Sequence, residues 1–185
     1  MKKPVYLFLA TGFEEIEVVT TVDILRRAEL ETIIVSVSGM LPVTGAHGIT
    51  VQADVPIQNV ADKGAAAAML ILPGGMPGAL NLANNPPLRQ IIEQAHTAGV
   101  PLSAICAAPM VYGRMGLLKG VRATCYPSFE AELTGATLLE QPVVIDGQFT
   151  TGRGPGVTID FALALVERLV GKEKVETLKT QMMCC

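Results

Sequence analysis

Short apolar runs alternate along this chain with segments of helical periodicity. The apolar runs lack the regular polar alternation of a strand that faces water on one side. We therefore expect strands that are buried on both faces, as in parallel sheets. These runs are Val5–Ala10, Thr32–Val37, Met69–Leu72 and Leu102–Ile105.

The segments between the apolar runs predict helices. The first of them, Glu15–Ala28, carries apolar residues at close to helical spacing: Ile16, Val19, Val22 and Leu25,. Further helices are expected at Pro87–Ala98, from Cys106 to Met115, at Val157–Val170 and at Glu173–Thr180,.

Three other segments indicate strands or hairpins. Gly39–Pro56 combines three glycines with alternating apolar residues, which predicts a short antiparallel hairpin at the sheet edge,. Val121–Thr124 predicts a further strand. Val143–Thr151 predicts a hairpin that turns at Asp146-Gly147,. Alternating strands and helices, with hairpins at the edges, are typical of an open, doubly wound α/β sheet.

Composition supports this fold class. Half of the 185 residues are hydrophobic but only 4% are aromatic, so the core must consist mainly of Ala, Val, Leu and Ile. No internal repeat or low-complexity linker interrupts the pattern. We expect one domain over residues 1–185.

Charge and cysteine spacing exclude several function classes. The net charge is −3 and no Lys/Arg run occurs, which argues against nucleic acid or an anionic membrane surface as partner,. The run Val5–Ala10 is too short for a secretory signal, and no apolar stretch approaches the ~20 residues of a membrane span. Four cysteines show no zinc or disulfide-framework spacing: Cys106, Cys125, Cys184 and Cys185,. We expect a cytoplasmic protein without a metal.

Cys106 is the strongest candidate for chemistry. It follows the strand Leu102–Ile105 directly and precedes a helix, the layout of a nucleophile elbow,. The N–H groups of a following helix favour a thiolate. The alternative is a buried cysteine that only packs, since free cysteine is among the most buried residue types.

Two other loops should reach the same crevice, beyond the carboxyl ends of the strands. Glu14 and Glu17 lie three apart at the start of the first helix, where carboxylates commonly cap,. Glu17 fits that explanation less well, because apolar residues flank it and a desolvated carboxyl group can take part in proton transfer. Gly74 and Gly75 could form only a tight turn, or could bring backbone N–H groups to an oxyanion,.

The remaining candidates favour structural roles. His47 and His96 are expected on the surface, because neither lies in a loop predicted to reach the crevice. Cys125 is expected to pack, and Cys184 and Cys185 to lie in a terminal tail without a function that the sequence explains.

Four ordered motifs resemble the ThiJ/PfpI superfamily, in the branch of the parkinsonism-associated protein deglycase and its bacterial relatives. These motifs are Gly12-Phe13-Glu14-Glu15-Ile16-Glu17, Leu72-Pro73-Gly74-Gly75, Ala104-Ile105-Cys106-Ala107-Ala108-Pro109 and Gly152-Arg153-Gly154-Pro155-Gly156. The resemblance covers nearly the whole chain. It implies a flavodoxin-like fold, a homodimer and no cofactor.

The resemblance also implies site roles. Cys106 would be the nucleophile and Glu17 its hydrogen-bonded partner, with backbone N–H groups of Gly75 and Ala107 facing an oxyanion. Arg153 would lie at the dimer-side edge of a pocket that also contains Glu14, Gly74 and Tyr126. Tyr126 stands where related proteins often carry histidine. Its presence weakens the case for peptidase or amidohydrolase chemistry, which needs an imidazole.

The leading hypothesis is therefore an enzyme acting on 2-oxoaldehydes (glyoxalase III-like) or on their early protein adducts (deglycase-like). The substrate class comes from the resemblance. A second hypothesis is an oxidative-stress sensor or chaperone in which Cys106 oxidises to a sulfinate held by protonated Glu17. Thiazole-phosphate biosynthesis is a weaker alternative, because the sequence contains no phosphate-binding loop.

Overall fold

A seven-stranded sheet forms the centre of the computed structural model, which describes residues 3–184. The strand order is β10-β11-β7-β6-β1-β2-β5, and every neighbouring pair is parallel except β10 with β11. The strands are β1 (Val5–Leu9), β2 (Thr32–Ser36), β5 (Val55–Pro56), β6 (Met69–Leu72), β7 (Leu102–Ile105), β10 (Val143–Asp146) and β11 (Phe149–Gly152). All residues of β1, β6 and β7 are buried, as expected for parallel strands covered on both faces,.

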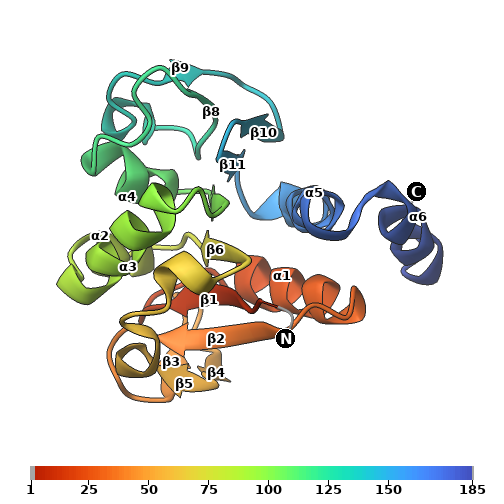
Figure 1. The fold of residues 1–185 in the computed structure, drawn as a ribbon, viewed down its shortest axis with the longest axis horizontal. Coiled ribbons are helices and arrows are strands. Elements are labelled where there is room, and N and C mark those ends of the chain that lie inside the picture. The colour runs from red at the N-terminus through yellow and green to blue at the C-terminus, as the bar shows by residue number, and fades with distance from the viewer. Residues whose placement is uncertain (1–2, 185) are drawn as a thin grey trace.

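Helices cover both faces of the sheet (Figure 1). One side carries α1 (Glu15–Arg27), α5 (Thr158–Val170) and α6 (Lys172–Gln181), and the other α2 (Gly78–Ala83), α3 (Pro86–Thr97) and α4 (Pro109–Arg114). Helix α5 packs against both α1 and α6. This arrangement confirms the predicted doubly wound α/β class.

The chain order brings three loops together at one end of the sheet. From β1 the chain passes outward to β2 and β5, and then returns to β6 on the other side of β1. The loops that follow β1 and β6 meet at the carboxyl ends of these strands, where α/β proteins bind ligands: Glu14 N donates to Gly74 O, and Gly78 N donates to Gly12 O,. The loop after β7 joins them, since β7 is the next strand along.

The predicted edge hairpin does not join the main sheet, and the predicted strand at Val121–Thr124 pairs outside that sheet as well. The hairpin within Gly39–Pro56 forms, but its strands β3 (Pro42–Thr44) and β4 (Thr50–Gln52) make a separate two-stranded sheet. The edge of the main sheet is β5 instead. Strand β8 (Arg122–Ala123) pairs with β9 (Thr137–Leu138), which the sequence analysis missed, in another small sheet. Strand β5 pairs with β2, and β9 pairs with β8. Each pair joins segments separated by intervening chain, and local sequence patterns do not encode such pairing.

Local signals placed most helices correctly. Asn85 Oδ1 accepts a hydrogen bond from Leu88 N at 2.9 Å and so caps α3,. The hairpin turn at Asp146-Gly147 forms between β10 and β11, with a positive φ of 54° at Gly147. The short helix α2 was missed. Helix α4 begins at Pro109, not directly after Cys106 as predicted.

Four short 3₁₀ segments complete the secondary structure: Ile57–Val60, Gly64–Ala66, Glu130–Glu132 and Pro155–Val157. Within residues 3–184, no helix is both long and apolar enough to cross a membrane.

Candidate active site

Cys106 lies at a strained elbow at the end of β7. Its φ of 64° falls in the left-handed region, which non-glycine residues seldom adopt,. Two hydrogen bonds hold this backbone: Cys106 N donates to Gly152 O at 2.9 Å, and Tyr126 N donates to Cys106 O at 2.8 Å. The conformation is thus held from both neighbouring segments, and such strain is common at functional sites.

The thiol of Cys106 is buried, with 8% of the residue exposed. Its pKa is raised to about 12, mainly by burial and then by neighbouring Glu17, although the N–H groups of Gly75 and Ala107 act to lower it. From the sequence, the helix that follows Cys106 is expected to favour a thiolate. That expectation is wrong: burial and the neighbouring Glu17 raise the pKa of the thiol by more than the backbone N–H groups lower it.

Glu17 approaches Cys106 from the first turns of α1 and is fully buried. Its Oε2 accepts a hydrogen bond from Gly74 N at 2.7 Å. Burial raises the pKa of Glu17 to about 7; the Gly74 N–H and the Cys106 thiol oppose this rise, and Glu14 adds to it. Near neutral pH the carboxyl group can therefore both hold and release a proton.

The ionisation states of Glu17 and Cys106 depend on each other. Each is a buried acid, and a negative charge on either disfavours ionisation of the other,. The pair therefore carries at most one negative charge around neutral pH. When Glu17 holds the proton, the N–H groups of Gly75 and Ala107 are the groups that stabilise charge on the sulfur.

Two glycines make this close approach possible. A Cβ at Gly74 would lie 2.6 Å from Cys106 Cβ and 2.9 Å from Glu17 Oε2. Gly75 has a φ of 86°, and a Cβ there would lie 2.3 Å from Glu14 N. Gly74 and Gly75 are therefore more than a tight turn, because each lies against the segment that carries Glu14 and Glu17.

Glu14 and Glu15 connect the site to a surface turn. Glu14 N donates to Gly74 O at 3.0 Å, which ties the start of α1 to the glycine loop. Glu15 Oε1 accepts from His47 N at 2.7 Å, and its Oε2 lies 2.8 Å from His47 Nδ1. The turn that carries His47 therefore does reach the loop after β1, contrary to the sequence analysis. Its side chain is nevertheless at the surface, as predicted, with 68% exposed.

Among residues 3–184, one group has three metal-ligand atoms within 4.8 Å of one another: Glu14, Glu15 and His47. The His47 imidazole already pairs with Glu15 and lies 3.5 Å from Glu14 Oε2. These contacts explain why the three side chains lie together: His47 and Glu15 form a hydrogen-bonded ion pair at the surface edge of the site, which we call the rim pair.

Tyr126 and Arg153 lie together beside the elbow, although Cys106 does not line their hollow. This hollow, of about 290 Å³, is bounded by Tyr126, Pro127, Arg153 and the segment 154–157. The half-exposed Tyr126 ring packs on Gly154, where a Cβ would approach it to 3.1 Å. Arg153 also borders a second hollow that contains Cys125. Burial raises the pKa of Cys125 to about 11, while Arg153 lowers it.

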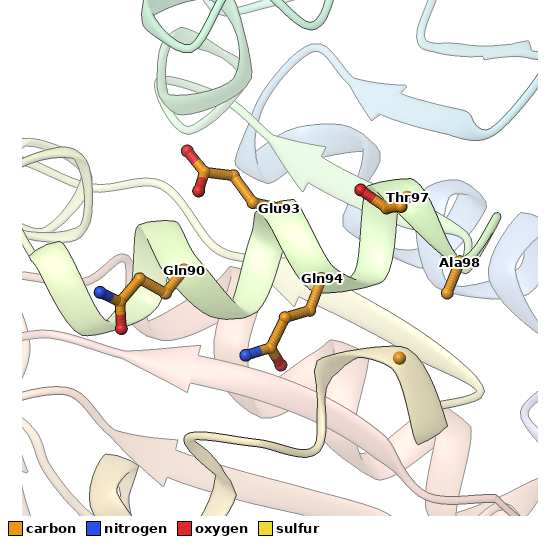
Figure 2. A pocket seen from close by; sticks show the side chains of 6 residues that line it. Gln90, Glu93, Gln94, Thr97 and Ala98 are labelled. Carbon is orange, nitrogen blue, oxygen red and sulfur yellow. The ribbon is translucent and has the colours of Figure 1, made fainter.

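A larger surface hollow of about 600 Å³ lies along α3, away from these residues. Figure 2 shows its lining, with Gln90 and Gln94 pointing the same way and Glu93 the opposite way; Ala65, Thr97 and Ala98 complete it. It contains neither a cysteine nor a histidine. Reactive groups therefore gather at the elbow and not at this hollow.

Comparison with known proteins gives consistent matches along the chain. Residues 3–168 match the DJ-1/PfpI family. The chain is 41% identical over 174 residues to protein DJ-1 homolog B of Arabidopsis thaliana, which covers 93% of this chain but only 39% of that longer protein. It is 35% identical over 167 residues to glutathione-independent glyoxalase DJR-1.2 of Caenorhabditis elegans, covering 89% of this chain and 87% of that one. The crystal structure of Drosophila melanogaster DJ-1beta matches with a TM-score of 0.94 at 31% identity, covering 100% of both chains.

We expect Gly74→Ala to disturb the site and to destabilise the fold by about 1–3 kcal/mol, because its methyl group would overlap Cys106 and Glu17,. Urea unfolding measures the loss, and the alkylation rate of Cys106 reports the disturbance. Gly156→Ala is the matched control, since a Cβ there meets nothing within 4 Å. Equal stability of the two variants would contradict the crowding argument.

The pairing of His47 with Glu15 predicts a pH-dependent contribution to stability. The hydrogen bond to Glu15 raises the pKa of His47 above 6.5. Burial acts to raise the pKa of Glu15, but its hydrogen bonds from His47 outweigh this and lower it below 4.5. The ion pair therefore contributes most to stability between pH 4.5 and pH 6.5, the ordinary pKa values of the two groups. Its contribution is lost as the pH rises through the raised His47 pKa or falls through the lowered Glu15 pKa.

Urea midpoints of the parent protein and of His47→Ala, measured from pH 4 to pH 9, test this. The difference should be largest between pH 4.5 and 6.5 and should shrink at higher pH. A difference that grows from pH 6.5 to pH 9 would show that the imidazole does not stabilise the turn through its charge.

Proposed function

The chain belongs to the DJ-1/PfpI family, and we propose that it is a cofactor-independent, cysteine-dependent enzyme that converts 2-oxoaldehydes to 2-hydroxy acids. The observation that carries this proposal is the buried Glu17–Cys106 pair, with backbone N–H groups of Gly75 and Ala107 at the sulfur. The similarity to a glutathione-independent glyoxalase supports the substrate class.

The reaction begins with the thiolate form of the pair. While Glu17 holds the proton, Cys106 Sγ attacks the aldehyde carbon and forms a hemithioacetal. The N–H groups of Gly75 and Ala107 stabilise the oxyanion that develops, because preorganised donors cost no reorganisation during the reaction. The proton passes from Glu17 to that oxygen, which leaves the carboxylate free to act as a base.

Glu17 then moves a proton between two carbons. Its carboxylate removes the hydrogen from the former aldehyde carbon, which gives an enediolate, and returns it to the neighbouring carbon. The hydroxyl proton on the first carbon passes to the oxygen on the second, so that the hemithioacetal becomes a thioester of a 2-hydroxy acid. Water hydrolyses the thioester, releases the acid and restores the thiol. The sum is one 2-oxoaldehyde plus one water giving one 2-hydroxy acid; the aldehyde carbon is oxidised while the neighbouring carbonyl carbon is reduced, so no external oxidant is needed. A pKa of about 7 suits a group that must accept and donate in one cycle,.

The same chemistry extends to early adducts of 2-oxoaldehydes on protein thiols and amines, which contain the same carbon skeleton. Glu14 and the exposed Tyr126 line the approach to the pair in this proposal. Tyr126 offers no imidazole to protonate a leaving amine, so we favour aldehyde chemistry over peptide or amide hydrolysis.

A redox role for the same thiol is the second candidate. A protonated Glu17 and the N–H groups of Gly75 and Ala107 are suitable donors for the oxygens of a Cys106 sulfinate,. Burial of the thiol does not separate the two roles, because catalytic and sensor cysteines are both typically accessible,. We favour the enzyme because of the similarity to a glutathione-independent glyoxalase.

We further propose that the protein forms a homodimer through α1 and the turn before β4. Ile16, Val19 and Ile49 are each more than half exposed there. Val19 also lines a groove of about 350 Å³, in which four other apolar residues are accompanied by three polar ones: Val18, Val22, Ile34 and Val51 with Asp23, Arg26 and Gln52. Exposed apolar residues grouped beside a groove are typical of protein interfaces, and this one would flank the Glu14–Glu17 segment.

The decisive test of function is methylglyoxal consumption and lactate formation without glutathione. Cys106→Ser should abolish turnover, and Glu17→Gln should slow it roughly 10²–10⁴-fold, the usual contribution of a general base. Cys184→Ser removes a thiol outside the site and should leave the rate unchanged. Circular dichroism confirms that each variant is folded.

Two results would contradict the proposal. Normal turnover in folded Glu17→Gln would remove Glu17 from the mechanism. No turnover in parent protein shown by mass to be unoxidised would favour the redox role.

For the dimer, light scattering should give a mass about twice the 19.5 kDa of one chain. Val19→Asp should reduce it to one chain, because a carboxylate would be desolvated in the interface. Val170→Asp, an exposed valine at the end of α5, is the control. A single-chain mass for the parent protein would exclude the dimer.

A further inference from the structure

The second carboxyl oxygen of Glu17 has no partner. Oε2 accepts from Gly74 N, but Oε1 makes no hydrogen bond, although the residue is fully buried. An unpaired buried oxygen is costly, particularly when the group must carry a charge. A group in reach of Oε1 would therefore affect how readily Glu17 ionises.

Thr21 presents an unpaired hydroxyl to the same region. It is 1% exposed, and its Oγ1 also lacks a partner. Thr21 lies four residues after Glu17 in α1, so the two side chains are neighbours on one face of the helix,. Two polar groups on adjacent turns, both buried and both unpaired, can satisfy each other through one bridging group.

Ser103 adds a third unpaired oxygen on this side of the sheet. A Cβ at Gly152 would lie 2.9 Å from Ile105 and 3.0 Å from Phe161 of α5, so the Ile105 side chain faces α5. Ser103 lies two residues earlier in β7 and therefore points to the same face. Helices α1 and α5 pack against each other on that face of the sheet, and Ser103 Oγ has no partner.

These three oxygens make up most of the buried side-chain polar atoms without a hydrogen-bond partner in residues 3–184. Five buried side-chain atoms lack a partner, and the other two, on Gln94 and His96, belong to α3 on the opposite face of the sheet. Buried water molecules typically make about three hydrogen bonds to such otherwise unpaired groups.

We propose that Thr21 and Ser103 hold one water molecule against Glu17 Oε1, which makes Thr21 a positioning residue for the general base. The water donates to Oε1 and accepts from the Thr21 hydroxyl, so it stabilises the ionised carboxylate that the reaction needs. This inference rests on the proposed function for its catalytic meaning, but the water site itself does not depend on any substrate.

The other groups that face Glu17 stay unchanged when Thr21 is replaced. The titratable ones are Glu14, at the N-terminus of α1, and Cys106, at the end of β7; Gly74 contributes its N–H. The buried side chains of α5 are apolar except Thr158, whose hydroxyl already donates to Pro155 O at 2.7 Å. A change in Glu17 titration can therefore be assigned to the lost hydroxyl.

The test is the carboxyl titration of Glu17 by NMR in protein labelled with ¹³Cδ-glutamate, with the signal assigned by its loss in Glu17→Gln. Thr21→Val removes the hydroxyl at similar volume and should raise the titration midpoint by about one pH unit. Thr21→Ser, which restores the hydroxyl, and Thr20→Val, which changes a neighbouring threonine, should not. Ser103→Ala provides a second variant and should also raise the midpoint.

Two further readouts separate this proposal from the proposed function. Turnover of Thr21→Val should fall roughly fivefold at pH 7 and recover at higher pH, as follows from a one-unit rise. A high-resolution crystal structure should show an ordered water within hydrogen-bond distance of Glu17 Oε1 and Thr21 Oγ1. A shifted titration midpoint in a protein that does not turn over methylglyoxal would contradict the proposed function but leave the water site supported. An unshifted midpoint in folded Thr21→Val, or a refined structure without the water, would overturn the positioning role.

Discussion

The structure of the site depends on burying two acids, Glu17 and Cys106, in one apolar space. Each would be expensive to ionise alone, and together they share a single charge near neutral pH,. Besides the Cys106 thiol, which donates to Glu17, the donors that reach them are backbone N–H groups: Gly74 for the carboxylate, Gly75 and Ala107 for the sulfur. A fixed backbone holds such donors in place at no side-chain entropy cost, which explains why the site is built from glycine turns and not from cationic side chains.

The fold supplies the rigidity that this arrangement requires. β1, β6 and β7 are buried on both faces and end at the same edge of the sheet. Their closeness leaves no room for a Cβ at Gly74, and it holds Cys106 in a left-handed conformation that a free chain would leave. The strain at the elbow is thus balanced by the hydrogen bonds of Cys106 to Gly152 and Tyr126,.

The surroundings change from apolar to polar over the short distance between the Glu17–Cys106 pair and the Glu15–His47 pair. Glu15, two residues before Glu17, meets an exposed imidazole and has a lowered pKa, whereas the pKa of Glu17 is raised. Neighbouring carboxylates on one helix turn therefore take opposite roles, because one points to a surface turn and the other into the core. The rim pair fixes the turn at His47, and the buried pair supplies the reactivity in the proposed reaction.

The sequence by itself determined the fold class and the main elements, because buried parallel strands and amphipathic helices follow from local patterns of apolar residues. It also singled out Cys106, Glu17, Gly74 and Gly75, since each stands at the end of a strand or the start of a helix. Only the tertiary structure decided that burial raises the thiol pKa, that His47 meets Glu15, and that Val55–Pro56 and Thr137–Leu138 pair as strands. Desolvation and long-range pairing depend on which distant segments meet in space, and no local window of sequence contains that information.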